Sequence, residues 1–336
     1  MRKAFVTYII LGVLLIVAFA LDVVLGDVSI PLEQIKGAIS DNASVSVKHI
    51  ILNYRLPKAL TALLCGAALA VSGLLMQTLF RNPLAGPYVL GISSGAGLGV
   101  AVLVLTAGYV TLPAWLALSG WAQIIAAIAG AAFVMFLVLL TATKVNDTVS
   151  LLIVGMMFGG IAGAVVNILQ SISNPDALKV YVVWTMGSLS AVTWNYMRVM
   201  APIIILCVMT ALFLPKRLNA LLLGENYAKG LGVSVSATRT LIIILTCLLA
   251  GASTAFTGPI AFIGVAVPHI VRGILKTSDH RLVLPASVLA GSTLLILCDI
   301  VSQLPGTIYT LPINSVCAVV GAPIILIVII KRKRII

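Results

Sequence analysis

The sequence predicts an all-α polytopic membrane protein with ten transmembrane helices in a single domain, residues 1–336. Two observations carry this prediction. The chain is 61% hydrophobic and only 9% charged, and its mean hydropathy of +1.19 is far from that of a soluble globular domain. Apolar runs of about 20 residues, the length of helix that crosses the hydrocarbon core, recur from one end of the chain to the other.

Polar breaks separate the apolar runs into spans. The ten predicted spans are residues 4–25, 60–79, 89–107, 121–141, 149–169, 199–214, 241–256, 260–275, 283–301 and 316–330. The first is also compatible with a signal peptide, but its apolar run is too long and no clear small-residue cleavage site follows it. Gly258-Pro259 alone separates the seventh span from the eighth, so one kinked helix is the alternative there.

Basic residues gather on one side of this topology. With the N-terminus inside, fifteen of the 21 Lys and Arg residues lie on the inner side. The outer six are Lys36, Lys48, Arg55, Lys58, Lys179 and Arg198. The positive-inside rule therefore predicts that both termini are cytoplasmic, and the net charge of +12 belongs to span ends rather than to nucleic-acid binding.

Two connections are too long for tight turns. Residues 28–58 form a predicted external segment, and residues 215–239 form a predicted internal one. Within the spans, glycines recur every four residues and predict smooth helix faces, either for tight packing alone or for a wall that slides: Gly91, Gly95, Gly99 and Gly155, Gly159, Gly163. Residues 66–73 resemble residues 251–258 five spans later, which suits an inverted-repeat core; a chance match of eight small residues is the alternative.

Reactive groups are scarce in the predicted spans. Only Asp22 and Asp299 place a carboxylate in or at the edge of a span, and no GxxxxGK[ST] phosphate loop is present. The five cysteines lie in apolar runs without CxxC spacing and are interpreted as packing residues: Cys65, Cys207, Cys247, Cys298 and Cys317. We therefore expect no enzymatic activity, no metal site and no cofactor, and any ATP must be hydrolysed by a partner.

Several motifs resemble one transporter family. Residues 81–87 read Arg-Asn-Pro-Leu-Ala-Gly-Pro, and residues 90–97 read Leu-Gly-Ile-Ser-Ser-Gly-Ala-Gly. Arg-Leu-Pro-Lys at 55–58, Gly-Pro-Ile-Ala-Phe-Ile-Gly at 258–264 with Pro268-His269, and Gly-Ala-Pro at 321–323 complete the set. Together they resemble the FecCD family of permeases, which serve ATP-driven importers of iron siderophores, haem and cobalamin.

This resemblance implies the architecture of a type II ABC importer permease in the bacterial inner membrane. The implied assembly is a homodimer with two cytoplasmic ATP-binding subunits and an external substrate-binding protein. It also implies an ATPase-coupling surface, for which an amphipathic helix on the lipid surface is the alternative. The implied coupling residues are Leu218, Leu221, Leu222, Gly224, Glu225, Ala228, Leu231 and Gly232.

On the outer side, Arg55 and Lys58 match basic positions that meet carboxylates of the binding protein in this family, although two such cations can also be interface anchors. The chain departs from the family at Gln303, where an arginine is frequent, and at Leu311-Pro312-Ile313-Asn314. Docking is therefore expected to use fewer charges or a differently charged partner.

For transport we expect alternating access through a cavity between two copies. The candidate pathway residues lie on the fifth span: Met156, Met157, Gly159, Gly160, Gly163 and Asn167. The candidate cytoplasmic gate residues are Asn82, Leu84, Thr148 and Val149. The predicted cargo is an iron chelate, either siderophore or haem; the alternatives are cobalamin by the same mechanism or, in a different class, a secondary transporter driven by an ion gradient.

Overall fold

The computed structural model describes residues 2–26, 30–39, 44–107, 119–142, 144–145, 148–303 and 309–332, and within these ranges its regular structure is entirely helical. Parts of the predicted external segment, residues 28–29 and 40–43, lie outside the described residues. So do Lys333 and Arg334 of the predicted inner charge. The all-helical fold class is confirmed.

A helix overlaps each of the ten predicted spans. These helices are α1 (Arg2–Val24), α4 (Leu56–Leu79), α5 (Ile92–Leu105), α7 (Gly120–Ala142), α8 (Thr148–Ile172), α10 (Trp194–Leu212), α13 (Val235–Thr257), α14 (Ile263–Leu275), α15 (His280–Ser302) and α16 (Ile313–Arg332). Among the described helices, seven segments are long and apolar enough to cross a membrane. The helix α5, the helix α14 and the apolar part of α16, Ile313–Ile327, are shorter.

Two predicted boundaries are settled by glycines with positive φ. Gly258 (φ +75°) ends α13, and α14 begins at Ile263, so the seventh and eighth spans are two helices and not one kinked helix. The third span begins later than predicted. Its first residues form the short 3-10 helix η2 (Pro87–Leu90), and Gly91 (φ +73°) separates this turn from α5. Both positions need a backbone conformation that glycine adopts without steric cost.

The helix α9 (Pro175–Met186) was not predicted from the sequence. Its start carries a clear signal, because Asn174 caps it by accepting a hydrogen bond from the Ala177 amide at 2.8 Å and proline occupies the first turn. At 12 residues α9 is too short to be found by a search for spans. It lies beside α5 and connects the end of α8 to α10.

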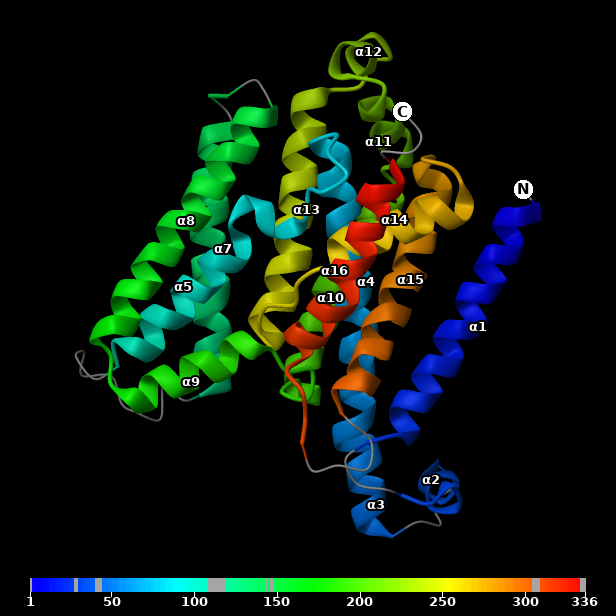
Figure 1. Cartoon of the computed structure of the whole chain (residues 1–336), viewed down its shortest axis with the longest axis vertical. Coiled ribbons are helices and arrows are strands. Elements are labelled where there is room, and N and C mark those ends of the chain that lie inside the picture. The colour runs from blue at the N-terminus through cyan, green and yellow to red at the C-terminus, as the bar shows by residue number, and fades with distance from the viewer. Residues whose placement is uncertain are drawn as a thin grey trace.

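The arrangement places the connections at two opposite ends of the bundle (Figure 1). Both termini lie at the end that carries α11 (Pro215–Leu222) and α12 (Glu225–Gly230). The other end carries α2 (Leu32–Ile39), α3 (Val45–Ile50) and the π-helix η1 (Ile51–Arg55) that leads into α4. We call these the coupling end and the α3 end.

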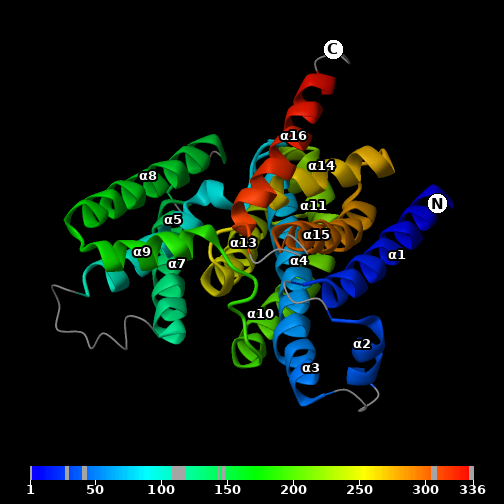
Figure 2. The same ribbon diagram turned by 60° about the horizontal axis from the view of Figure 1, so that its bottom comes forward.

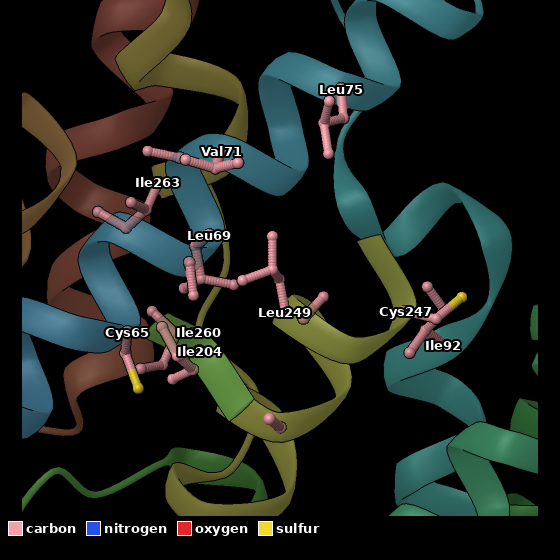
Figure 3. Close-up of a cluster of buried hydrophobic side chains, with 14 of the residues drawn as sticks. Cys65, Leu69, Val71, Leu75, Ile92, Ile204, Cys247, Leu249, Ile260 and Ile263 are labelled. Carbon is pink, nitrogen blue, oxygen red and sulfur yellow. The ribbon is translucent and has the colours of Figure 1, made fainter. Parts of the chain in front are cut away.

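The centre of the bundle is formed by α4 and α13, which pack against each other and run in opposite directions, as expected for the two halves of an inverted repeat. In both views α1 and α8 lie on opposite flanks (Figures 1 and 2). Figure 3 shows the apolar core between α4 and its neighbours, including Leu69 and Leu75 of α4, Ile204 of α10 and Leu249 of α13. This core fixes the central helices that join the two ends.

Close backbone approach fixes α4 against α14 and α15. A Cβ at Gly66 would collide with the carbonyl of Gly291, and a Cβ at Gly73 would collide with the carbonyl of Gly264. Small residues allow this approach because helices inside a membrane associate through van der Waals packing and hydrogen bonds rather than through a hydrophobic drive. The helix α4 is therefore held closely against two helices of the second half of the chain.

Candidate functional site

The coupling segment, residues 215–232, is a pair of short helices joined at Gly224. Gly224 has φ +120° and ψ 152°, a conformation essentially restricted to glycine. The helix α11 ends at Leu222 and α12 begins at Glu225, so Gly224 lies in the break between the two helices. The turn projects the two helices from the coupling end of the bundle (Figure 1).

The implied coupling residues do not all lie on the outer surface of this segment. Leu218, Leu221 and Ala228 are buried against the rest of the chain, and Leu222 is half-buried. The exposed apolar side chains are instead Leu223, Tyr227 and Leu231, at 66%, 56% and 58%. The first two were missed, because the helical period places leucines on one face without indicating whether that face points inward.

Glu225 anchors α12 to the bundle. Its carboxylate lies 2.9 Å from the guanidinium of Arg239, a buried residue in the second turn of α13. Gly232, at the end of the segment, is exposed and has φ +78°. The coupling segment therefore combines an anchored inner face with an apolar outer one, and its role in contacting an ATPase stays a prediction.

The predicted gate loop lies close to this segment. Asn82 stabilises the loop locally, since its side-chain oxygen accepts the Leu84 amide at 3.0 Å. His269 of α14 holds the next residue, with its Nε2 2.7 Å from the carbonyl oxygen of Pro83. Leu84 and Val149 are exposed, at 46% and 62%. Their role as a gate stays a prediction. Thr148 begins α8, and its side chain lies outside the described part of the structure.

The two predicted docking cations at the α3 end are buried, where exposed cations were expected. Arg55 donates to the carbonyl oxygens of Val23 and Val24, at 3.2 and 2.6 Å, and so closes the end of α1. Lys58 is only 6% exposed. The expectation of exposure was wrong because each side chain turns toward α1 to satisfy buried acceptors; the docking role itself stays a prediction.

Lys58 belongs to a buried charge cluster with Asp22, Asp299 and Gln303. Its Nζ lies 3.0 Å from Asp299 Oδ2 and 3.7 Å from Asp22 Oδ1. Gln303 Nε2 donates at 2.9 Å to the same two oxygens. The departure from the family at position 303 therefore has a structural explanation, since an amide here bridges the two carboxylates. The sequence had singled out both aspartates but could not place them together.

A cavity of about 580 Å³ opens beside this cluster. Arg55, Lys58, Asp299 and Gln303 line one side of it, and a mainly hydroxyl and apolar wall formed by residues 186–190 and 310–313 lines the other. The charged groups of this cluster therefore line a recess rather than an exposed surface. The second departure from the family, at residues 311–314, also makes a contact within the chain. The Oδ1 of Asn314 accepts the Ala261 amide at 3.0 Å and ties α16 to the loop before α14.

The predicted pathway helix α8 presents two different faces. Gly155 and Gly159 approach the backbone at Val89–Gly91 so closely that a Cβ at Gly155 would lie 2.8 Å from the Val89 carbonyl oxygen. A Cβ added at Gly160 or Gly163 would meet no described atom within 4 Å. Met156, Met157 and Asn167 are exposed. The glycine stripe is therefore a packing contact at its start and an open face at its end.

No metal centre is indicated. Across the ranges that the structure describes, no three His, Cys, Asp or Glu side chains converge in the way a metal ion needs. Arg272 and Gln77 instead pair with each other, the guanidinium donating to Gln77 Oε1 at 2.6 Å. The polar residues at the coupling end thus bond to one another and to backbone groups.

Comparison with known proteins agrees with this arrangement. The model of the FecCD transport family matches residues 14–331. The vitamin B12 import system permease protein BtuC of Salmonella typhi is 38% identical over 301 residues, covering 88% of both chains. BtuC of Klebsiella pneumoniae subsp. pneumoniae is 38% identical over 284 residues, covering 84% of this chain and 83% of the relative.

A solved structure is similar over nearly the whole fold. It is described as an inward-facing conformation of a metal-chelate type ABC transporter. Its TM-score is 0.84 at 30% sequence identity, with 96% of this chain and 97% of the other covered. The likeness therefore extends from α1 to α16 rather than resting on the core alone.

Proposed function

Since the chain belongs to the FecCD transport family, as the match over residues 14–331 shows, we propose that it imports a corrinoid such as cobalamin. The coarser assignment is established: the chain is a membrane permease subunit of an ABC importer and a transport component rather than an enzyme. What the proposal adds is the cargo. It is supported by relatives of 37–38% identity that are vitamin B12 permeases.

The iron chelate predicted from the sequence becomes the second candidate. One observation favours it, namely the similarity over 96% of the chain to a transporter described as of the metal-chelate type. Both cargoes are metals already held by an organic ligand, so neither needs protein ligands for a bare ion. Haem and siderophores therefore belong in the same transport test as cobalamin.

The proposed assembly is a homodimer in the bacterial inner membrane with two ATP-binding subunits and an external binding protein. Support for the dimer comes from the open face of α8 at Gly160 and Gly163, where the absence of side chains lets a second copy approach closely. Support for both termini being cytoplasmic comes from their position at the coupling end, beside α11 and α12. The α3 end, with its charged recess, would then face the binding protein.

In the proposed mechanism the permease offers a passage rather than a tight binding site. The loaded binding protein docks at the α3 end, the cargo enters between the two copies along α8, and ATP-driven closure of the partners moves the coupling segment. The open face around Gly160 and Gly163 suits a cavity wall, while the packed face at Gly155 connects this wall to η2. We also propose that the chain itself binds no cofactor.

A transport assay tests the cargo. The permease, reconstituted with its ATPase and binding protein in proteoliposomes, is given labelled cyanocobalamin, haem or a ferric siderophore. ATP-dependent accumulation of cyanocobalamin alone supports the corrinoid proposal, and accumulation of an iron complex alone replaces it. Uptake that follows an imposed ion gradient without ATP would point to the secondary-transporter alternative.

A further inference from the structure

The coupling end holds a chain of hydrogen bonds that begins on α11 and ends on α4. Asn219 of α11 donates through Nδ2 to Asp279 Oδ1 at 2.6 Å. Its Oδ1 accepts the backbone amide of His280 at 2.9 Å and faces His280 Nδ1 at 2.7 Å. His280 Nε2 in turn lies 2.7 Å from the hydroxyl oxygen of Thr78, in the last turn of α4.

The inner bond of this series, between His280 and Thr78, is shielded from water, whereas Asn219 and Asp279 are half-buried. His280 is fully buried and Thr78 is 1% exposed. Asn219 presents its carbonyl oxygen to Nδ1 of His280, so we assign the ring proton to Nδ1, which leaves Nε2 facing the Thr78 hydroxyl oxygen. The Thr78 hydroxyl has one proton, and Nε2 shares it with the carbonyl oxygen of Leu74, 2.8 Å away on the same helix. Each side chain in the series thus has a partner on both sides, and in a low-dielectric interior such a series resists separation of its members.

The far end of the series leads directly to the predicted gate. Four residues after Thr78, α4 has ended and Asn82 shapes the loop that includes Leu84. Arg81 between them has φ +44°, so the chain turns sharply there. The Arg81 guanidinium also lies near Gly224, at 3.8 Å from the position of an added Cβ. The loop is therefore joined to α11 and also lies beside the turn that joins the two coupling helices.

We propose that Asn219, His280 and Thr78 form a relay that transmits displacement of the coupling segment to the loop at residues 81–84. Contacts carry the proposal, since α11 packs against both α15 and α4 and the relay lies between the three helices. The inference rests on the proposed function, because it assigns a path to the movement that an ATPase would cause. The three residues are positioning residues and are not expected to touch the cargo.

The test compares variants that cut the relay with variants that preserve it or break a neighbouring bond. Thr78→Val removes the hydroxyl at nearly constant shape, whereas Thr78→Ser keeps it. Asn219→Ala removes the first member. Tyr8→Phe is the matched control, because it removes a 2.6 Å hydrogen bond to Leu282 in the same first turn of α15 without touching α11.

Three quantities are measured for each complex: assembly with the ATPase, stimulation of ATP hydrolysis by the binding protein, and cyanocobalamin uptake per ATP hydrolysed. Thr78→Val and Asn219→Ala are expected to assemble normally but to lose stimulation and uptake per ATP by about 5- to 150-fold, the usual range of coupling between two sites. Thr78→Ser and Tyr8→Phe are expected to remain near wild type. The double variant should be no worse than the worse single one, because both cut the same path.

Wild-type stimulation in both relay variants would overturn the proposal, and so would an equal loss in Tyr8→Phe or losses that multiply in the double variant. A loss that follows reduced assembly alone would also overturn it, because the relay would then only stabilise the fold. A wild-type complex that fails to take up cyanocobalamin counts against the proposed cargo instead. The relay is then judged from stimulation of ATP hydrolysis, which does not depend on the identity of the cargo.

Discussion

The ammonium group of Lys58 lies 3.0 Å from Oδ2 of Asp299, and both residues are buried where α1, α4 and α15 meet. We predict that Lys58→Met destabilises the fold by about 3–5 kcal/mol, because removal of one partner leaves buried carboxylates without compensation. Thermal unfolding of the purified permease measures this. Adding Asp299→Asn should restore part of the loss; a single variant as stable as wild type would show that the pair does not hold the helices.

The exposed outer face of the coupling segment is predicted to make the ATPase contact. Tyr227→Ala, at a position 56% exposed, should weaken copurification with the ATPase without lowering the stability of the permease. Leu218→Ala should instead lower the stability of the permease by about 2–5 kcal/mol without weakening copurification, because this side chain is fully buried. Equal behaviour of the two variants in a pull-down and a thermal melt would contradict the assigned directions.

Gly224 is predicted to tolerate no side chain. Its φ of +120° would impose about 1–3 kcal/mol of backbone strain on any other residue. Gly224→Ala should therefore distort the turn between α11 and α12 and reduce coupled uptake, while the dimer still folds. Gly230→Ala is the control, since this helical position has no positive φ and no atom within 4 Å of an added Cβ.

The glycines of α8 are predicted to differ along the helix. Gly159→Leu should force α8 away from η2 and α5, because a Cβ there already lies 3.4 Å from Gly91 Cα and from Ser94 Oγ. Gly163→Leu meets open space and should leave stability unchanged. Ile161→Leu, on an exposed face, serves as the reference for uptake. If the three variants have the same uptake and the same melting temperature, the packing of α8 has no part in the mechanism.

We predict that Asp279 makes a contribution to the stability of the fold that is lost in acid. The hydrogen bonds it accepts from the Arg281 amide and from the Asn219 side chain hold its pKa below the ordinary value of 3.8. Its stabilising effect is thus fully present above that value and is lost as the pH falls through the lower pKa of the folded state. Asp279→Asn should flatten the acid limb of a stability curve measured between about pH 5 and pH 2. A curve as steep as that of wild type would assign the acid sensitivity to other carboxylates.

The membrane fold could be predicted from the sequence because hydrocarbon imposes length and polarity on every span. The break at Gly258 and the turn at Gly224 were also predictable, since the geometry there depends on one residue type. The direction of the leucines in α11 was not, because it depends on which helices lie beneath them. The same holds for Lys58, whose partners Asp22 and Asp299 are 36 and 241 positions away in the chain.

The contacts at the coupling end also could not be predicted from the sequence. His269 stands in one of the motifs that resemble the family, but the sequence did not indicate its contact with the carbonyl oxygen of Pro83. His280 gave no signal of its own, although it is fully buried and bonded on both ring nitrogens. Its partners come from α11 and α4, and a single sequence contains no periodic pattern that pairs residues across 202 positions.

The attachment of α1 has a consequence for biosynthesis. This helix is synthesised before the other described helices, yet it packs mainly on α15, and the hydrogen bond between Gln303 and Asp22 joins positions 281 residues apart. Until the ninth predicted span is made, the carboxylate of Asp22 lacks its bridging amide and α1 lacks its principal neighbour. Because synthesis proceeds from the N-terminus, α1 has Arg55 and Lys58 as early partners, but its principal neighbour α15 is added much later. We expect the packing of α1 to be completed late in the assembly of the bundle.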